Sequence, residues 1–357
     1  MDRTTRQRIR YLRTEDDVQL AWAEAGEGPL LLKASNWLTH LEYDLESPVW
    51  RHWIRFFADH FRFVRFDERG CGMTDWTVED FTFTPWVKDL ELVADTVSPS
   101  APMILLGISQ GAAACIAYAA RHPERVSHLI LYGGYSRGIA KRSNPTHERL
   151  YAAIIELARL GWGTKNPSFR QVFTSRFIPG GTDEQLDWFN ELCVKTTSPE
   201  NAARLLEARA DIDVVDLLPQ VHTPTLVLHA RKDAVTPFEE GRRLAAGIPG
   251  AQFVELDSPN HVLLDGEPAW ERFQEAVLDF VGLDAPRGED PAFAALSTRE
   301  REVLALVTEG LGNAAIAERL ALSEKTVRNH ISNVFDKLGV WTRAQAIVFA
   351  RDRGFGA

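Results

Sequence analysis

The chain has 357 residues, 45% of them hydrophobic and 25% charged, a balance typical of globular rather than disordered proteins. This length accommodates one large domain and a small one. The net charge of −10 is unevenly distributed: the segment from Ala292 onward holds nine Lys/Arg and seven Asp/Glu, whereas the residues before it hold 31 and 43. An acidic body with a slightly basic end indicates that only the C-terminal segment would meet a polyanion.

Cysteine spacing and the lack of long apolar runs exclude several classes of protein. The three cysteines, Cys71, Cys115 and Cys193, have neither metal-site spacing nor a disulfide framework, so we expect a reducing compartment, the cytoplasm. The N-terminal residues are charged, and no run approaches the roughly 18–20 apolar residues of a membrane-spanning helix. We therefore expect no signal peptide and no membrane partner, and no motif predicts a metal or a cofactor.

Strands and helices alternate along the first part of the chain. Alternating or apolar runs predict strands at 7–13, 18–23, 29–34, 61–66, 103–106 and 126–132, of which the first two form a hairpin. Helical spacing predicts a helix around Trp50 to Phe57 and another over 85–96. This alternation implies right-handed crossovers and a mostly parallel sheet, which places the chain in the α/β class.

One short stretch carries the clearest catalytic pattern. The apolar run ending at Leu106 is followed by Gly107-Ile108-Ser109-Gln110-Gly111 and then by an Ala-rich helical segment. The two glycines leave room for a tight turn that lifts the Ser109 side chain above the carboxyl edge of the sheet. This strand–turn–helix is a nucleophile elbow, and in it the chain resembles the α/β-hydrolase family. The alternative is a chance match in a loop, which the flanking strand and helix disfavour.

The alternation stops between about residues 136 and 213, where helical stretches occur without a convincing strand. This insertion resembles the cap that many α/β-hydrolases carry over the active site, and we expect most of its aromatic residues to form the cap's own core. The alternation then resumes, with strands at 225–229 and 252–256 and helices at 237–246 and 269–281. We therefore expect a ligand-sensing α/β-hydrolase-like domain over 1–283 and a linker at 284–292.

The family resemblance implies a triad in the order Ser, acid, His, with the last two on loops after late strands. Asp233 follows the strand 225–229 and matches the acid, and His261 follows the strand 252–256 and matches the base. Either residue alone is more often an ordinary loop residue, but both in this order favour a triad with Ser109. A Ser at the elbow, in place of Asp, argues against epoxide or haloalkane chemistry.

The resemblance also implies an oxyanion hole built from two backbone N–H groups. Gln110, directly after the nucleophile, matches the first donor. Many relatives have His-Gly after the third strand, whereas this chain has Ser35-Asn36 followed by Trp37. The Trp37 N–H is the second expected donor, at a position where the sequence departs from the family pattern.

Residues 293–357 predict a separate, all-α domain. Ser297 and Glu300 have capping-box spacing at the start of its first helix. Three further helices are expected, over 313–320, 324–337 and 343–351. The pattern is a helix-turn-helix with a supporting fourth helix, and it closely resembles the LuxR-type DNA-binding domain through LSTREREVLALVTEG, NAAIAERL and LSEKTVRNHISNVFDKLGV.

The helix 324–337 is the expected recognition helix. Its core positions, spaced i, i+4, i+7 and i+11, are Val327, Ile331, Val334 and Leu338. By resemblance, the base edges are faced by Arg328, Asn329 and Ser332, and the phosphates are contacted by Lys325, Thr326, His330 and Lys337. The fourth helix usually forms the dimer contact in this family, which implies a homodimer on DNA. The alternative is a solvated, charged face on a small protein-binding bundle.

Together these features predict a one-component transcription regulator with two partners, promoter DNA and a small molecule. The ligand expected in the hydrolase-like cleft is an ester, lactone, amide or acid. The alternative is a cytosolic serine esterase or lactonase with an accessory DNA-binding tail. Whether Ser109, Asp233 and His261 turn over a carboxylic ester stays open from the sequence.

Overall fold

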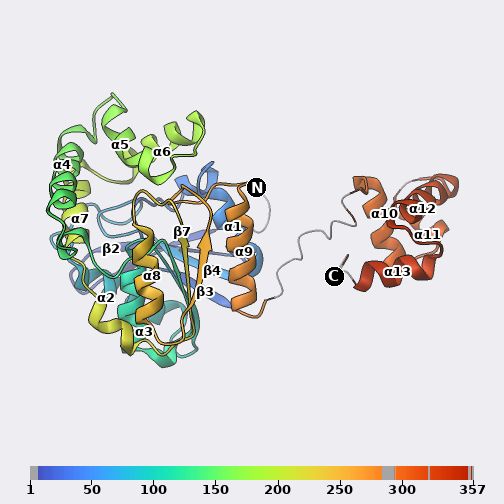
Figure 1. Ribbon diagram of the computed structural model, residues 1–357, viewed down its shortest axis with the longest axis horizontal. Helices are drawn as coiled ribbons and strands as arrows, with labels where there is room; N and C mark the ends of the chain where they lie inside the picture. Colours follow the sequence, from blue (N-terminus) through green and yellow to red (C-terminus); the bar gives the residue numbers. More distant parts are fainter. Residues whose placement is uncertain (1–6, 284–292, 294, 321, 353–354, 356–357) are drawn as a thin grey trace. The chain divides into compact units, whose positions relative to one another are not determined.

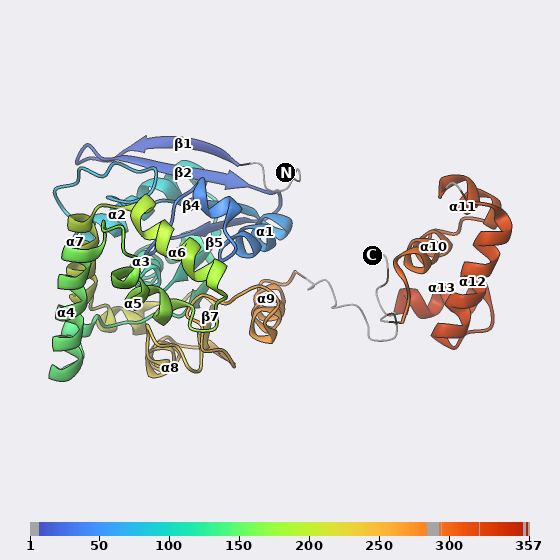
Figure 2. The ribbon, with the colours of Figure 1, turned by 90° about the horizontal axis from the view of Figure 1, so that it is seen from above.

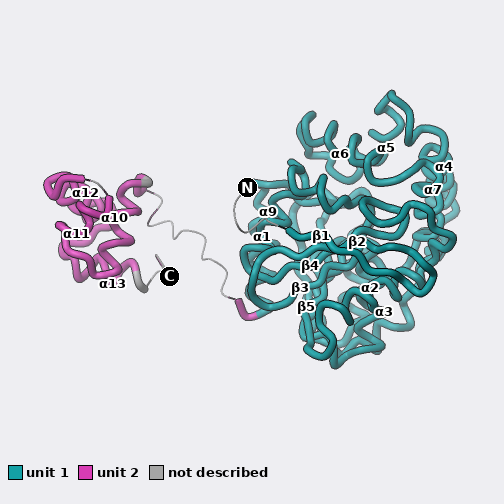
Figure 3. Tube along the Cα trace, turned by 180° about the vertical axis from the view of Figure 1, so that it is seen from behind, with its two compact units in different colours: residues 1–281 teal, residues 282–357 magenta. Residues whose placement is uncertain are grey.

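The computed structural model of the protein describes residues 7–283, 293, 295–320, 322–352 and 355. The chain divides into two compact units, Met1–Val281 and Gly282–Ala357 (Figure 3). The expected linker, 284–292, lies outside the described residues, so the domain boundaries stay a prediction.

An eight-stranded sheet forms the centre of the first unit (Figure 1). Its strands are β1 Arg8–Arg13, β2 Gln19–Ala25, β3 Leu30–Lys33, β4 Arg62–Phe66, β5 Met103–Ile108, β6 Val126–Tyr132, β7 Thr225–Ala230 and β8 Gln252–Leu256. They lie in the order β1-β2-β4-β3-β5-β6-β7-β8. The β1–β2 and β2–β4 pairs are antiparallel, and the remaining pairs are parallel. The predicted hairpin and mostly parallel α/β sheet are confirmed.

Helices cover both faces of this sheet (Figures 1 and 2). On one face lie α1 Arg51–His60 and α9 Pro268–Phe280, and on the other lie α2 Phe83–Val97, α3 Gly111–Arg121 and α8 Phe238–Gly247. Trp53 of α1 packs against Trp270 and Phe273 of α9, with ring centroids 4.6 and 4.8 Å apart. Because it is covered on both sides, β5 is buried at every residue, which explains its continuous apolar run.

Short 3₁₀ turns and a helical cap complete the first unit. The 3₁₀ turns are Tyr43–Glu46, Pro123–Arg125, Ile139–Lys141 and Val215–Gln220. Between β6 and β7 the cap contributes α4 Pro145–Gly161, α5 Ser168–Phe177, α6 Asp183–Thr196 and α7 Pro199–Ala210 (Figure 1). Side-chain caps from Asn144, Thr182 and Ser198 start α4, α6 and α7. The expected helical insertion is therefore present, and an isolated bridge between Arg137 and Asp213 closes its base.

The described residues of the second unit form four α-helices. They are α10 Thr298–Thr308, α11 Asn313–Arg319, α12 Glu324–Leu338 and α13 Arg343–Asp352. The predicted capping box is present, because Ser297 and Glu300 each accept the backbone N–H of the other. The core positions of α12 are buried as predicted, namely Val327, Ile331, Val334 and Leu338. None of the helices in the described ranges has the length and apolarity needed to cross a bilayer.

Candidate functional site

Ser109 occupies a strained turn between β5 and α3. Its φ is 54°, in the left-handed region that residues other than Gly, Asn and Asp rarely adopt. Small residues make the turn feasible: a Cβ on Gly107 would lie 2.6 Å from the Ala112 Cα, and one on Gly111 would lie 2.8 Å from the Ser35 oxygen. The sequence Gly-x-Ser-x-Gly thus folds into the expected elbow, and stored backbone strain of this kind is common at functional sites.

The predicted acid and base are hydrogen-bonded to each other. Asp233 Oδ2 lies 2.5 Å from His261 Nδ1, and Asp233 Oδ1 accepts the N–H groups of Val235 and Thr236 at 2.7 and 2.9 Å. This pairing assigns the proton to Nδ1 and leaves Nε2 of the buried His261 as an acceptor without a partner among the described residues. His229, which the sequence did not single out, braces the same loop with Nε2 3.0 Å from the Thr236 oxygen, and burial lowers its pKa.

Two consecutive glycines after β6 lie between this pair and the elbow. A Cβ on Gly133 would approach His261 Cε1 to 3.1 Å, and one on Gly134 would lie only 2.4 Å from the Cβ of Ala112 in α3. A larger residue at Gly133 would therefore crowd the imidazole, and one at Gly134 would displace the start of α3. Ser109 Oγ has no hydrogen-bond partner among the described residues, so its contact with His261 stays a prediction.

The two expected oxyanion donors line the same cavity as Ser109. Trp37 and Gln110 both border it, and neither backbone N–H has an acceptor within the described chain. The loop that holds Trp37 is braced from below, because Lys33 Nζ donates to Asn36 Oδ1 and Asn36 Nδ2 donates to the Trp37 oxygen at 3.0 Å. Lys33 is fully buried, and desolvation lowers its pKa to about 8.

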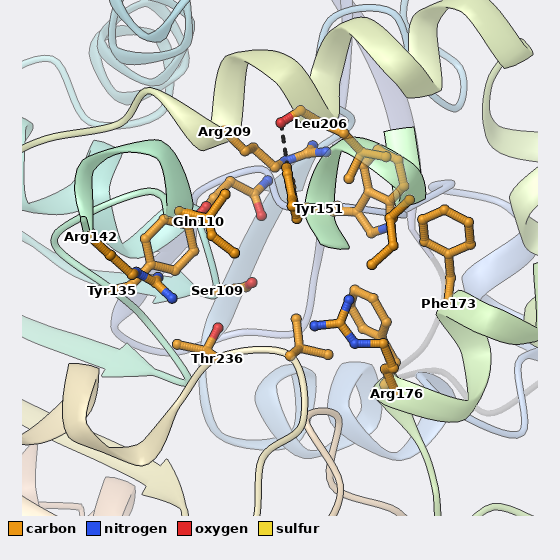
Figure 4. A pocket seen from close by; sticks show the side chains of 15 residues that line it. Ser109, Gln110, Tyr135, Arg142, Tyr151, Phe173, Arg176, Leu206, Arg209 and Thr236 are labelled. Atoms are coloured by element: carbon orange, nitrogen blue, oxygen red, sulfur yellow. Dashed lines mark hydrogen bonds between the residues drawn. The ribbon is translucent and has the colours of Figure 1, made fainter. Parts of the chain in front are cut away.

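The cavity itself is small, about 90 Å³ (Figure 4). The sheet side contributes Trp37, Ser109, Gln110, Val235 and Thr236, and the cap contributes mainly Tyr151, Ile154, Phe173, Phe177 and Leu206. The Tyr151 hydroxyl donates to the Leu206 carbonyl at 3.1 Å, and burial raises the pKa of Tyr151 to about 12. Several of the cap's aromatic residues thus form the cavity wall in addition to the cap core.

Three arginines in the cavity wall were missed by the sequence analysis. They are Arg142, from the segment between β6 and α4, Arg176 of α5 and Arg209 of α7. Arg209 pairs with the buried Glu68 at 2.6 Å, and its guanidinium lies 4.2 Å over the Trp37 ring. The sequence contains only one weak indication that these arginines have a special role. Arg142 and Arg176 have no acidic residue three or four positions away in either direction, so neither can form the usual ion pair within a helix.

The outer face of α12 carries the predicted DNA-binding residues. Exposed side chains are those of Lys325, Arg328, Asn329, Ser332 and Lys337, and those of Thr326 and His330 are half-buried. The Lys337 ammonium also donates to Glu300 Oε2 of α10 at 2.7 Å. A DNA phosphate bound by Lys337 would therefore share the ammonium group with Glu300.

Comparisons with known proteins match the two units of the chain to two different families. The family described as "Bacterial regulatory proteins, luxR family" matches residues 294–350, and the family described as "Serine aminopeptidase, S33" matches residues 53–268. The AB hydrolase superfamily protein YisY of Bacillus subtilis (strain 168) is 27% identical over 255 residues, which are 70% of this chain and 91% of YisY. The spore germination protein GerE of the same organism is 55% identical over 53 residues, 15% of this chain and 72% of GerE.

Solved structures support the fold of the first unit. A hydrolase from Pseudomonas aeruginosa PA01 superposes with a TM-score of 0.63 at 23% identity, covering 77% of this chain and 98% of that one. At this identity the likeness shows the fold alone. The chain therefore belongs to the α/β-hydrolase family described as serine aminopeptidase S33, and it carries a LuxR-type DNA-binding domain in residues 294–350.

Proposed function

We propose that this protein is a one-component transcription regulator that senses a small ester, lactone, amide or acid in the cavity over Ser109. The observation that carries the proposal is the presence, in one chain, of a LuxR-type DNA-binding domain and a hydrolase domain whose cavity is lined by Ser109. A cavity of about 90 Å³ suits a small effector better than a peptide or a lipid. Ligand binding between cap and sheet then biases the arrangement of a DNA-bound homodimer.

On the DNA side, the exposed face of α12 acts as the recognition surface. Arg328, Asn329 and Ser332 face base edges, since their side chains combine exposure with the hydrogen-bonding groups used in the major groove. The phosphate contacts in this proposal come from Lys325, Thr326, His330 and Lys337.

On the ligand side, the proposed chemistry is acyl transfer. Ser109 Oγ attacks the ligand carbonyl carbon while His261 Nε2 takes the hydroxyl proton, and Asp233 stabilises the imidazolium that forms. The N–H groups of Trp37 and Gln110 donate to the oxyanion. His261 then protonates the leaving alcohol or amine, and a water that the same imidazole deprotonates releases the acid from Ser109. Slow turnover of this kind would end the signal by destroying the ligand.

A serine esterase or lactonase with an accessory DNA-binding domain is the second candidate. It is favoured by the 2.5 Å hydrogen bond between Asp233 and His261, because a receptor that only binds its ligand needs no oriented imidazole. Mass spectrometry of the full chain after incubation with p-nitrophenyl acetate tests this candidate. An acetyl group on Ser109, or release of p-nitrophenol that Ser109→Ala lacks, supports catalysis. An unmodified Ser109 without such release contradicts it.

Reporter output from the target promoter, compared for wild type and Ser109→Ala at equal protein levels, tests the regulator. A variant that is locked on or off, or that responds at lower ligand concentration, supports sensing at Ser109. Unchanged output contradicts sensing at this residue and favours the second candidate.

A further inference from the structure

Arg176 brings an unpaired positive charge into the cavity. Its guanidinium points into the space that Ser109 also faces (Figure 4). Its Nε and Nη2 donate to the Ala234 carbonyl at 3.3 and 3.0 Å, and no carboxylate of the described residues lies within 4.0 Å of it. Asp233 directly precedes Ala234 in the sequence, but its two carboxylate oxygens already accept hydrogen bonds from its own loop and from His261. A half-buried cation in this position is costly unless something pairs with it.

The positive charges of the other two arginines, Arg209 and Arg142, are neutralised by nearby carboxylates to different degrees. Arg209 forms a close, buried pair with Glu68 at 2.6 Å. Arg142 has its nearest carboxylate, that of Glu240, at 3.8 Å, and Glu240 lies closer to Arg243, at 3.2 Å. The cavity wall of 15 residues contains, within the described part of the chain, three arginines and no acidic residue. Its net charge is therefore positive, and Arg142 and Arg176 contribute the charges that have no close carboxylate among the described residues.

We propose that the ligand carries a free carboxylate, which Arg176 binds together with Arg142 while a second carbonyl group of the same molecule lies at Ser109. The inference rests on the proposed function, because it places the ligand in the same cavity and specifies its chemical class as a small half-ester, half-amide or carboxy-lactone. Arginine is suited to this role because its planar fork matches the two oxygens of a carboxylate. Since Arg176 and Arg142 belong to the cap and Ser109 to the sheet, such a ligand would tie the two layers together.

A carboxylate fits this wall better than a phosphate. Phosphate sites in proteins draw on free backbone N–H groups at helix N-termini or in nests. The N–H groups in the loop beside Arg176, those of Val235 and Thr236, already donate to Asp233 Oδ1. The N–H groups of Trp37 and Gln110, which have no acceptor in the described chain, are beside Ser109, where the second carbonyl group would lie, so an anion at Arg176 must be held by side-chain forks. The small volume also favours the smaller group.

Calorimetric titration of the full chain carrying Ser109→Ala tests the inference without turnover of the probe. The probes are monomethyl glutarate, which has a free carboxylate, and dimethyl glutarate, its neutral analogue. We expect the monoester to bind and the diester to bind roughly tenfold more weakly or not at all, because a charge-assisted hydrogen bond is lost. Adding Arg176→Gln should weaken monoester binding by a similar factor, whereas Arg242→Gln, on the exposed surface of α8, should leave it unchanged.

Each other outcome overturns the inference. Equal binding of the two esters, absence of binding by both, or unchanged affinity in Arg176→Gln shows that no carboxylate site exists there. If inorganic phosphate binds as tightly as monomethyl glutarate does, the assignment of the site to a carboxylate is wrong. Should Arg176→Gln fail to fold, Arg142→Gln provides the same comparison. Acylation of Ser109 by p-nitrophenyl acetate is measured separately, on the chain with Ser109 intact. The proposed catalysis can therefore be supported even if the carboxylate site is contradicted.

Discussion

The backbone N–H of His261 donates to the carbonyl of Phe177, the last residue of α5, at 2.8 Å. The two side chains also touch, with ring centroids 5.2 Å apart in an edge-to-face arrangement. The candidate base is therefore held from two directions, by Asp233 in the sheet domain and by the cap. A ligand that shifts α5 would move the imidazole as well, which gives the cap a direct route to the site.

Replacing Phe177 with Ala should destabilise the hydrolase domain by about 3 kcal/mol, because the ring is buried against His261 and Phe189. Phe169→Ala on the same helix is the matched control, and its effect should be much smaller because that ring is 38% exposed. Urea unfolding of the full chain, followed by tryptophan fluorescence, measures both. Equal losses in the two variants would contradict the proposed support of His261 by the cap.

Ser109→Gly should stabilise the hydrolase domain by about 1 kcal/mol and abolish acylation. The gain is expected because Ser109 has a φ of 54°, which glycine adopts without steric cost. Ser109→Ala retains the strained conformation and should lose acylation without the gain in stability. The two variants are compared by urea unfolding and by mass spectrometry after treatment with p-nitrophenyl acetate. A Gly variant less stable than the Ala variant would show that the turn is not strained.

Local patterns were sufficient to predict much of the first unit. The apolar run of β5, the flanking glycines and the following Ala-rich segment each specify local structure, so the elbow at Ser109 was predictable. The meeting of Asp233 and His261 was predictable for a related reason: each lies in the loop after a parallel strand, and the carboxyl ends of parallel strands share one edge of the sheet. Their roles with Ser109 stay a prediction.

Residues whose role depends on packing between distant elements were not predictable. Arg176 reaches the cavity only because α5 lies over the sheet, and no helical period specifies how a cap is oriented. Lys33 ends an apolar strand, yet its ammonium is buried under the Trp37 loop through Asn36. The pairing of Lys337 with Glu300 joins residues 37 positions apart on two helices, so periodicity within α12 indicated only that Lys337 would be exposed.

The Glu300–Lys337 pair should make the DNA-binding domain sensitive to acid. Its hydrogen bonds, first from Lys337 and then from the Ser297 N–H, lower the pKa of Glu300 from 4.5 to about 2. Because the pKa is lower in the folded state, the pair contributes its full stability above about pH 4.5 and loses it as the pH falls toward 2. The protection factors of α10 and α12 amides in the full chain, which are hydrogen-exchange rates corrected for the intrinsic rate at each pH, should therefore decrease over this range.

Glu300→Gln is the variant that isolates this contribution. It keeps the side-chain length and the cap hydrogen bond to Ser297 but carries no titrating charge. Its protection factors at pH 6 should be lower than those of wild type, and they should change less between pH 4.5 and 2. Identical pH profiles for the two proteins would show that the ion pair does not couple α10 to α12.

Arg328→Ala and Lys325→Ala should separate base recognition from phosphate binding on α12. Both side chains are exposed, whereas Val327 and Ile331 of the same helix are buried. Arg328→Ala should weaken binding to the specific operator by about 1–3 kcal/mol and leave non-specific binding nearly unchanged. Lys325→Ala should weaken both kinds of binding and reduce the slope of log K against log salt concentration by about 1. Fluorescence anisotropy at several salt concentrations measures both quantities, and a uniform loss in Arg328→Ala would move that residue from the base-reading to the phosphate-binding group.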